Sequence, residues 1–246
     1  MGREIEIMFF ENSDQLNRYM VDERHIQRVM ISFSCGKDSI GCWINMRRFY
    51  PEIIPFYLYL IPDLEFVEES LNYYESVFGC HIIRLPHPSL YRWMRNLVFC
   101  DPPVAELYNR LNPVSFDYED IRKLVWDAAG DDGDGYYGLG VRAADNINRW
   151  GSIKRFGPIN QKQHKFYPIF DWNKQKLMDE IKGAGIKLPV DYRMFGRSFD
   201  GIDYRFLVQI KKYYPRDYDR ILELFPLADM EIYRREKWAN EKAKVI

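Results

Sequence analysis

The sequence predicts an α/β fold: a doubly wound, mostly parallel sheet with helices on both faces, followed by a helical C-terminal extension. Three observations predict it. Short apolar runs alternate with amphipathic segments, glycines and prolines separate these runs, and the chain from Tyr204 onward has a mostly helical pattern. Strands that alternate with helices are joined by right-handed crossovers and are therefore parallel. We expect residues 1–190 to form the α/β domain and residues 191–246 to form a helical extension packed on it.

The first part of the chain repeats a strand and helix unit. The expected strands are residues 28–34, 53–60 and 80–85, and the expected helices are residues 39–50 and 64–78. Gly79 directly follows the second helix, where a glycine commonly ends a helix. These elements are expected to form the first parallel strands of the sheet and the helices that connect them.

The second part of the chain is less regular. Prolines interrupt residues 86–118, so we expect helix fragments and loops there. Beyond them we expect a helix over 118–129, a turn over 131–135, a glycine-rich strand over 136–141, one or two helical turns over 144–150, a polar loop up to Lys165, and a short strand over 166–170. Asp171 is the expected N-cap of a helix that ends at Gly183 or Gly185.

Composition and charge narrow the classes of function. The 246 residues carry a formal net charge of −1, which argues against a protein that coats nucleic acid by bulk electrostatics but allows a local basic patch. No signal-peptide core and no run of roughly 18 apolar residues is present, so we expect a cytoplasmic protein without a membrane partner. The cysteines form no Cys-x-x-Cys pair, so we expect neither zinc nor an iron–sulfur cluster.

The segment Ser-Cys-Gly-Lys-Asp-Ser, residues 34–39, has the composition of a phosphate-binding loop. It lies between an expected strand and helix, where backbone N–H groups and the helix dipole favour anions. Gly36 allows an oxyanion to approach, Ser34 and Ser39 offer hydroxyls, and Lys37 adds a compact charge. Asp38 fits beside an anion if it holds Mg²⁺ or orients the loop. The spacing matches neither the mononucleotide P-loop nor G-x-G-x-x-G.

A basic cluster follows the fourth expected strand. Arg142 and Arg149 lie seven residues apart and would share one face of a helix. Further basic side chains follow at Lys154, Arg155, Lys162, His164 and Lys165, and only Asp145 offsets them. Contact with phosphate or nucleic acid and a solvated charged surface are both open interpretations. The tail also interleaves aromatic and basic residues, but acidic residues break up that pattern, so we interpret it as a packed helical cap.

Three motifs, in order along the chain, resemble known families. Residues 34–39 are similar to the S-G-G-x-D-S pyrophosphate loop of the PP-loop ATP pyrophosphatase superfamily, with Cys35 in place of the first glycine. Residues 140–149, GVRAADNINR, resemble the G-x-R-x-x-E-S-x-x-R pattern of the phosphoadenosine phosphosulfate (PAPS) reductase-like family, with Asp145 and Asn146 replacing Glu and Ser. Residues 167–172, YPIFDW, and the later GIKLP resemble that family's P-I-x-D-W and I-P segment.

The resemblance implies an adenine nucleotide alpha hydrolase-like fold. It also implies an enzyme that uses Mg²⁺ to cleave the α–β bond of ATP and that forms an adenylate or transfers it to an unknown acceptor. The implied catalytic residues are Lys37, Asp38 and Arg142, and Asp38 is also the implied Mg²⁺ ligand. The implied nucleotide-binding residues are Ser34, Cys35, Gly36, Lys37, Asp38, Ser39, Gly140, Arg142 and Arg149. Lys37, the loop amides and Arg142 or Arg149 would neutralise charge as pyrophosphate leaves.

The cysteines separate this chain from PAPS reductases, which use a cysteine near the C-terminus. No cysteine follows Cys100, so a partner protein is expected to supply any sulfur or nucleic-acid chemistry. Three alternatives stay open: PAPS or adenosine phosphosulfate (APS) reductase-type activity with an external thiol, adenylate transfer to a flavin, and a non-catalytic nucleotide-dependent regulator.

Overall fold

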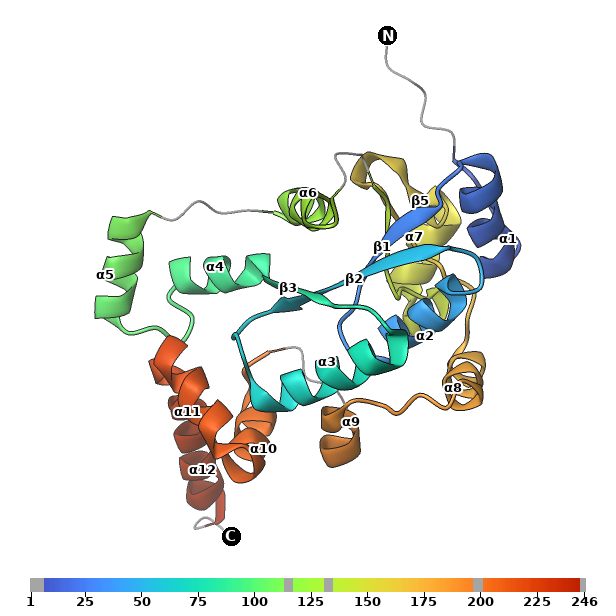
Figure 1. Cartoon of the computed structure of the whole chain (residues 1–246). Helices are drawn as coiled ribbons and strands as arrows, with labels where there is room; N and C mark the ends of the chain where they lie inside the picture. The colour runs from blue at the N-terminus through green and yellow to red at the C-terminus, as the bar shows by residue number, and fades with distance from the viewer. Residues whose placement is uncertain (1–6, 113–116, 131–134, 197–200, 244–246) are drawn as a thin grey trace. The chain divides into compact units, whose positions relative to one another are not determined.

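The computed structural model describes residues 7–112, 117–130, 135–196 and 201–243 (Figure 1). Contacts between these residues divide the chain into two compact units. The sheet unit comprises Met1–Leu58, Tyr74–Leu85 and Asp117–Leu188, and the helical unit comprises Tyr59–Tyr73, Pro86–Phe116 and Pro189–Ile246.

The sheet has six strands in the order β3-β2-β1-β4-β6-β5. Their bounds are β1 Arg28–Ser32, β2 Glu52–Tyr59, β3 Ile83–Pro86, β4 Tyr137–Gly138, β5 Ile159–Asn160 and β6 Lys165–Phe166. Strand β1 is parallel to both β2 and β4, β4 is parallel to β6, and β5 runs antiparallel to β6. Chain order reverses direction across the sheet between β1 and β4, so the sheet is doubly wound as predicted, and β1 adjoins the switch point.

Both faces of the sheet are covered. Val29, Met30 and Ile31 of β1 are all fully buried, although successive side chains of a strand point to opposite faces. The helices of the sheet unit are α1 Ser13–Arg18, α2 Lys37–Met46, α6 Tyr118–Ala128, α7 Ile147–Phe156 and α8 Lys174–Gly183, and α3 Glu65–Phe78 contributes its last turns. The predicted fold class, a mostly parallel α/β sheet, is confirmed.

Aromatic packing fixes the position of α2. The ring of Phe33, which directly follows β1, is fully buried and meets the edges of Tyr74 and Phe78 at centroid distances of 5.1 and 5.2 Å. Trp43 of α2 stacks on Phe78 with a centroid distance of 4.0 Å. Such pairs add attraction beyond the area they bury. The residues on both sides of Ser34–Ser39 are therefore held by the core.

The helical unit has its own core. Its helices are α4 Pro88–Arg95, α5 Pro102–Leu111, α9 Val190–Phe195, α10 Tyr204–Tyr213, α11 Pro215–Leu224 and α12 Asp229–Ala243, with the first turns of α3. Leu207, Ile221 and Phe225 are fully buried in it. Asp217 of α11, also buried, accepts hydrogen bonds from the backbone N–H groups of Glu65 and Phe66 at 2.8 and 3.1 Å. This carboxylate therefore caps the positive end of α3.

The structure corrects several sequence-based expectations. The helix expected over one or two turns near 144–150 starts at Ile147, because Asn146 caps it by accepting from the backbone N–H of Arg149, and it continues to Phe156 as α7. The predicted polar loop up to Lys165 is thus wrong in part. The strands predicted over 136–141 and 166–170 contract to β4 and β6 of two residues each. The turn predicted over 131–135 falls largely outside the described residues.

The start of α8 is also corrected. The N-cap is Asn173, whose side chain accepts from the backbone N–H of Lys176 at 2.8 Å, and not Asp171. Asp171 instead accepts hydrogen bonds from the backbone N–H and the hydroxyl of Ser13, the first residue of α1. Its carboxylate therefore joins two segments distant in sequence, which spacing alone cannot show.

The predicted helical extension is helical in the residues described. The residues from 189 onward share their compact unit with residues 59–73 and 86–116, and the domain boundary at residue 190 stays a prediction. Within the parts of the chain that the structure describes, no helix combines the length and the apolar character required to cross a bilayer.

Candidate functional site

The loop from Ser34 to Ser39 leaves the end of β1 and enters the N-terminus of α2. Gly36 is the N-cap residue, and no side chain of the described residues caps this helix end. The loop closes on itself: the hydroxyl of Ser39 donates to the carbonyl of Gly36 at 2.9 Å, and the backbone N–H of Gly36 donates to the hydroxyl of Ser34 at 3.4 Å. The first amides of α2 and the helix dipole thus lie at the carboxyl edge of the sheet, where anions bind.

Cys35 has the backbone conformation that favours glycine. Its φ is +58°, in the left-handed region, and its side chain is buried. Gly36 has φ −70°, which any residue adopts. Gly36 was expected to let an oxyanion approach the backbone, whereas the left-handed residue of the loop is Cys35, one position earlier. A non-glycine residue there costs about 1–2 kcal/mol.

Five charged side chains form a continuous network beside the loop. Asp38 accepts from the ammonium of Lys37 at 3.2 Å and from Nε of Arg142 at 2.7 Å. Asp145 accepts from Nη2 of Arg142 and from Nη1 of Arg149, both at 2.5 Å. The network holds three cations and two carboxylates and therefore carries a net charge of +1. It favours an anion at the loop, but modestly.

Gly140 brings the second motif against the loop. A Cβ atom at this position would lie 2.6 Å from the backbone carbon and oxygen of Asp38 and 2.9 Å from the backbone nitrogen of Ser39. These backbone atoms cannot swing aside as the end of a flexible side chain can. Only a residue without a side chain fits this contact, so Gly140 acts through close packing against the start of α2.

The third motif supports the other two. The backbone carbonyl of Trp172 accepts from Nη1 of Arg142 at 3.4 Å, and that of Phe170 accepts from the backbone N–H of Ala143 at 2.8 Å. The carbonyl of Pro168 accepts from the side-chain amide of Asn45 in α2 at 2.8 Å. Asn45 is a residue of the site that the sequence motifs do not include. A polar residue on the apolar face of a helix was the available signal for it.

The two arginines of the second motif have different environments. Arg142 lies before the short 3-10 turn Ala143–Asp145 and not on a helix, so the expectation that it shares a helix face with Arg149 is wrong. Its side chain is 5% exposed, and its three nitrogens all donate to described partners. Arg149 is 46% exposed, and Lys37 is 27% exposed. Lys37 and Arg149 can reach an anion in solution, whereas Arg142 has the contacts of a positioning residue.

Three of the cysteines, Cys42, Cys80 and Cys100, have raised pKa values and are therefore poor nucleophiles. Burial raises the pKa of Cys42, which is completely enclosed, with a smaller contribution from Asp38. Burial also raises the pKa values of Cys80 and Cys100, with contributions from nearby carboxylates. A thiol with a raised pKa stays protonated near neutral pH, and the thiolate is the reactive form.

The charged residues do not by themselves build a magnesium site. Both carboxylate oxygens of Asp38 accept from cationic side chains, so Mg²⁺ bound there would have to displace Lys37 or Arg142 or tolerate their charge. Among the described residues, no group of three or more His, Cys, Asp or Glu side chains is placed to hold a metal ion. The assignment of Asp38 as a Mg²⁺ ligand stays a prediction.

No protein-family profile matches the chain, and no curated protein matches it. Among solved structures, the chain is similar to a predicted subunit of a tRNA methyltransferase from Methanocaldococcus jannaschii, with 16% sequence identity and a TM-score of 0.31. The match covers 64% of this chain and 76% of that chain. The functional interpretation therefore depends on the geometry of the loop and its network.

Proposed function

We propose that this chain is a PAPS reductase-like PP-loop enzyme that binds ATP and cleaves its α–β bond, forming an adenylate or transferring it to an acceptor. One observation carries the proposal: the loop Ser34–Ser39 lies at an uncapped helix N-terminus, and Gly140 and Arg142 of the second motif pack against its Asp38. Two motifs of one family resemblance thus meet at the edge of the sheet where α/β folds bind nucleotides.

The proposed step is a displacement at the α-phosphorus of ATP. A nucleophilic oxygen of the acceptor forms a bond to this phosphorus as the bond to the β-phosphate oxygen breaks, and pyrophosphate leaves. The amides of α2 would hold the pyrophosphate end, with Lys37 and Arg149 compensating its growing charge. Arg142 and Asp38 would hold Lys37 in place through their ion pair at 2.7 Å. Water in place of the acceptor would give AMP.

Cys42, Cys80 and Cys100 give the reductase alternative no support, because burial raises the pKa values of these three thiols. Such an activity would need an external thiol or a partner protein. We therefore place adenylate chemistry first and keep the reductase and the non-catalytic regulator as outcomes of the test.

The test is pyrophosphate release from ATP with Mg²⁺ present, alone and with candidate acceptors. The wild-type protein should release pyrophosphate, and K37A should abolish release because it removes the partly exposed cation of the loop. K123A is the matched control: Lys123 is an exposed lysine of α6 in the same unit, and its loss should change nothing.

Two other results would replace the proposal. Sulfite release from PAPS with an added thiol would indicate the reductase alternative. Tight ATP binding without any turnover, measured by calorimetry and by the ATP pool after long incubation, would indicate a regulator. Mass spectrometry of co-purified nucleotide would distinguish ATP from a phosphosulfate as the ligand.

A further inference from the structure

Helix α7 exposes large apolar side chains. Ile147 is 80% exposed, Trp150 is 48% exposed and Phe156 is 56% exposed, although Ile153 of the same helix is buried and anchors it. Two exposed aromatic residues on a helix of ten residues form an unusual surface, because aromatic side chains normally bury most of their area.

The same helix is strongly basic. It carries Arg149, Lys154 and Arg155 and no acidic residue, which gives a charge of +3 over ten residues. The chain contains no acidic residue anywhere from 146 to 165. The ammonium of Lys154 lies 4.5 Å from the centre of the Trp150 ring, and the guanidinium carbon of Arg155 lies 5.1 Å from the centre of the Phe156 ring. Each exposed aromatic ring thus has a cation beside it.

We propose that α7 is a binding surface for single-stranded nucleic acid. The cations would contact backbone phosphates, and Trp150 would provide the main platform on which a base stacks. The charge of the surface is complementary to a polyanion, and stacking on aromatic rings is the common mode of single-strand recognition. A lipid surface fits less well, because the cations are interleaved with the aromatic rings, whereas a membrane-bound helix separates an apolar face from a charged one.

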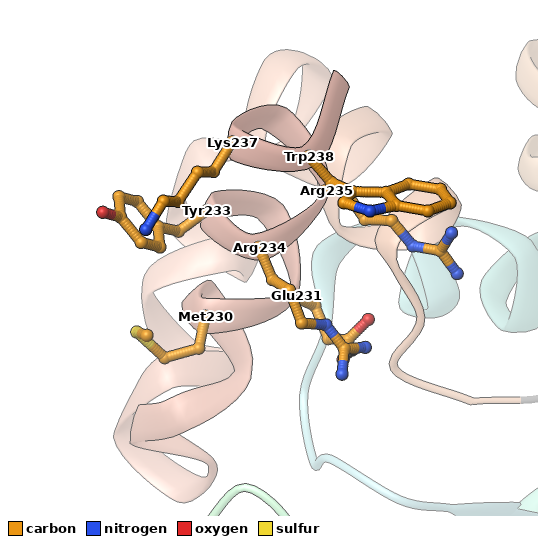
Figure 2. A pocket seen from close by; sticks show the side chains of 7 residues that line it. All are labelled: Met230, Glu231, Tyr233, Arg234, Arg235, Lys237 and Trp238. Carbon is orange, nitrogen blue, oxygen red and sulfur yellow. Dashed lines mark hydrogen bonds and ion pairs between the residues drawn. The ribbon is translucent and has the colours of Figure 1, made fainter. Parts of the chain in front are cut away.

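Helix α12 provides an internal comparison within the chain. Seven of its residues line a surface hollow, and most of them are aromatic or basic (Figure 2): Met230, Glu231, Tyr233, Arg234, Arg235, Lys237 and Trp238. Figure 2 shows Lys237 beside Tyr233 and Arg235 beside Trp238. However, α12 as a whole contains four acidic and four basic residues, so its net charge is zero, against +3 for α7, while each helix has an arginine in an ion pair, Arg234 with Glu231 and Arg149 with Asp145. Similar aromatic residues without net charge should bind a polyanion poorly.

The surface on α7 is distinct from the proposed ATP chemistry, since only Arg149 belongs to both. A nucleic acid bound on α7 would lie near the candidate nucleotide site, because Arg149 shares Asp145 with Arg142. The binding proposal stands whether or not ATP is cleaved.

The test is fluorescence anisotropy of a labelled ten-nucleotide oligo(dT) or oligo(rU) with the full chain at low salt. Binding should be detected, and W150A should weaken it by about five- to 150-fold, the range expected for loss of one stacked base. W150F should restore most of the affinity, because a smaller aromatic ring still stacks. The control W238A removes an exposed tryptophan of α12 and should leave the affinity unchanged.

Salt dependence tests the charged part of the surface. With three phosphate contacts, the logarithm of the affinity should fall with the logarithm of the salt concentration at a slope of about −2, and the double variant K154A/R155A should reduce that slope to about −0.7. W150A should keep wild-type pyrophosphate release when no nucleic acid is present, so the two proposals fail separately.

Any of three results would overturn the proposal. The wild type does not bind the oligonucleotide at low salt, W150A keeps the wild-type affinity, or W150A and W238A lower the affinity equally. Anionic phosphatidylserine vesicles that bind more tightly than the oligonucleotide, and lose binding in W150A, would overturn it in favour of a membrane surface.

Discussion

Replacement of Gly140 by alanine should disturb the candidate site more than any other single methyl group. The added Cβ atom would lie 2.6 Å from the backbone carbon and oxygen of Asp38, about 1 Å closer than ordinary van der Waals contact. The loop would have to move by a comparable distance, because the opposing atoms belong to the backbone. Overpacking of this kind costs about 1–3 kcal/mol of unfolding free energy. A displacement of about 1 Å in a reacting group can lower turnover by roughly 100-fold.

The assay for G140A combines urea unfolding with pyrophosphate release. The matched control is G183A at the end of α8, where an added Cβ atom meets no described atom within 4 Å. G183A should keep full turnover and should equal or exceed the wild type in stability by up to about 1 kcal/mol, because alanine favours helix. Wild-type stability and turnover in G140A would refute the contact between the two motifs.

Three further substitutions test the network, the helical unit and the loop. R142A should lower the unfolding free energy measured in urea by about 2–4 kcal/mol, because two carboxylates lose a buried partner. R149A should lower it by less than about 1 kcal/mol, because Arg149 is partly exposed. Equal effects of the two variants would contradict the positioning role of Arg142. Burial raises the pKa of Asp191 from its ordinary value of 3.8 to about 6, so the folded chain holds this proton more tightly than the unfolded chain. The stability that Asp191 contributes should therefore be lost as pH rises from 3.8 to about 6, and D191N should flatten that decline; unchanged curves would contradict it. The free energy of unfolding should be about 0.5–1 kcal/mol higher for C35G than for C35A, because glycine adopts φ +58° without strain. Equal stabilities of the two variants would contradict this expectation.

The sequence predicts the local parts of this fold well. The apolar residues over 28–34 and 39–50 predict β1 and α2, and Gly79, which follows the helical pattern, predicts the end of α3. The position of Ser34–Ser39 between strand and helix follows from the same pattern. These features depend on neighbours within a few turns, which sequence patterns report directly.

The contacts that assemble the candidate site could not be predicted in this way. Asp38 and Arg142 are 104 residues apart in sequence, and the role of Gly140 depends on which backbone atoms oppose it. The assumption that Arg142 lies on a helix was wrong because Asn146 starts α7 four residues later. The left-handed conformation of Cys35 was likewise hidden, because cysteine gives no local signal for a positive φ.

The most direct test of the account is competition for ATP binding, measured by calorimetry. If the loop Ser34–Ser39 holds the pyrophosphate end of ATP, inorganic pyrophosphate should displace ATP more strongly than adenosine does, and K37A should weaken ATP binding at least about tenfold, the loss of one charge-assisted contact. K123A should bind ATP as the wild type does. If the wild type does not bind ATP, or if K37A binds it equally well, the loop Ser34–Ser39 does not hold the pyrophosphate end of ATP.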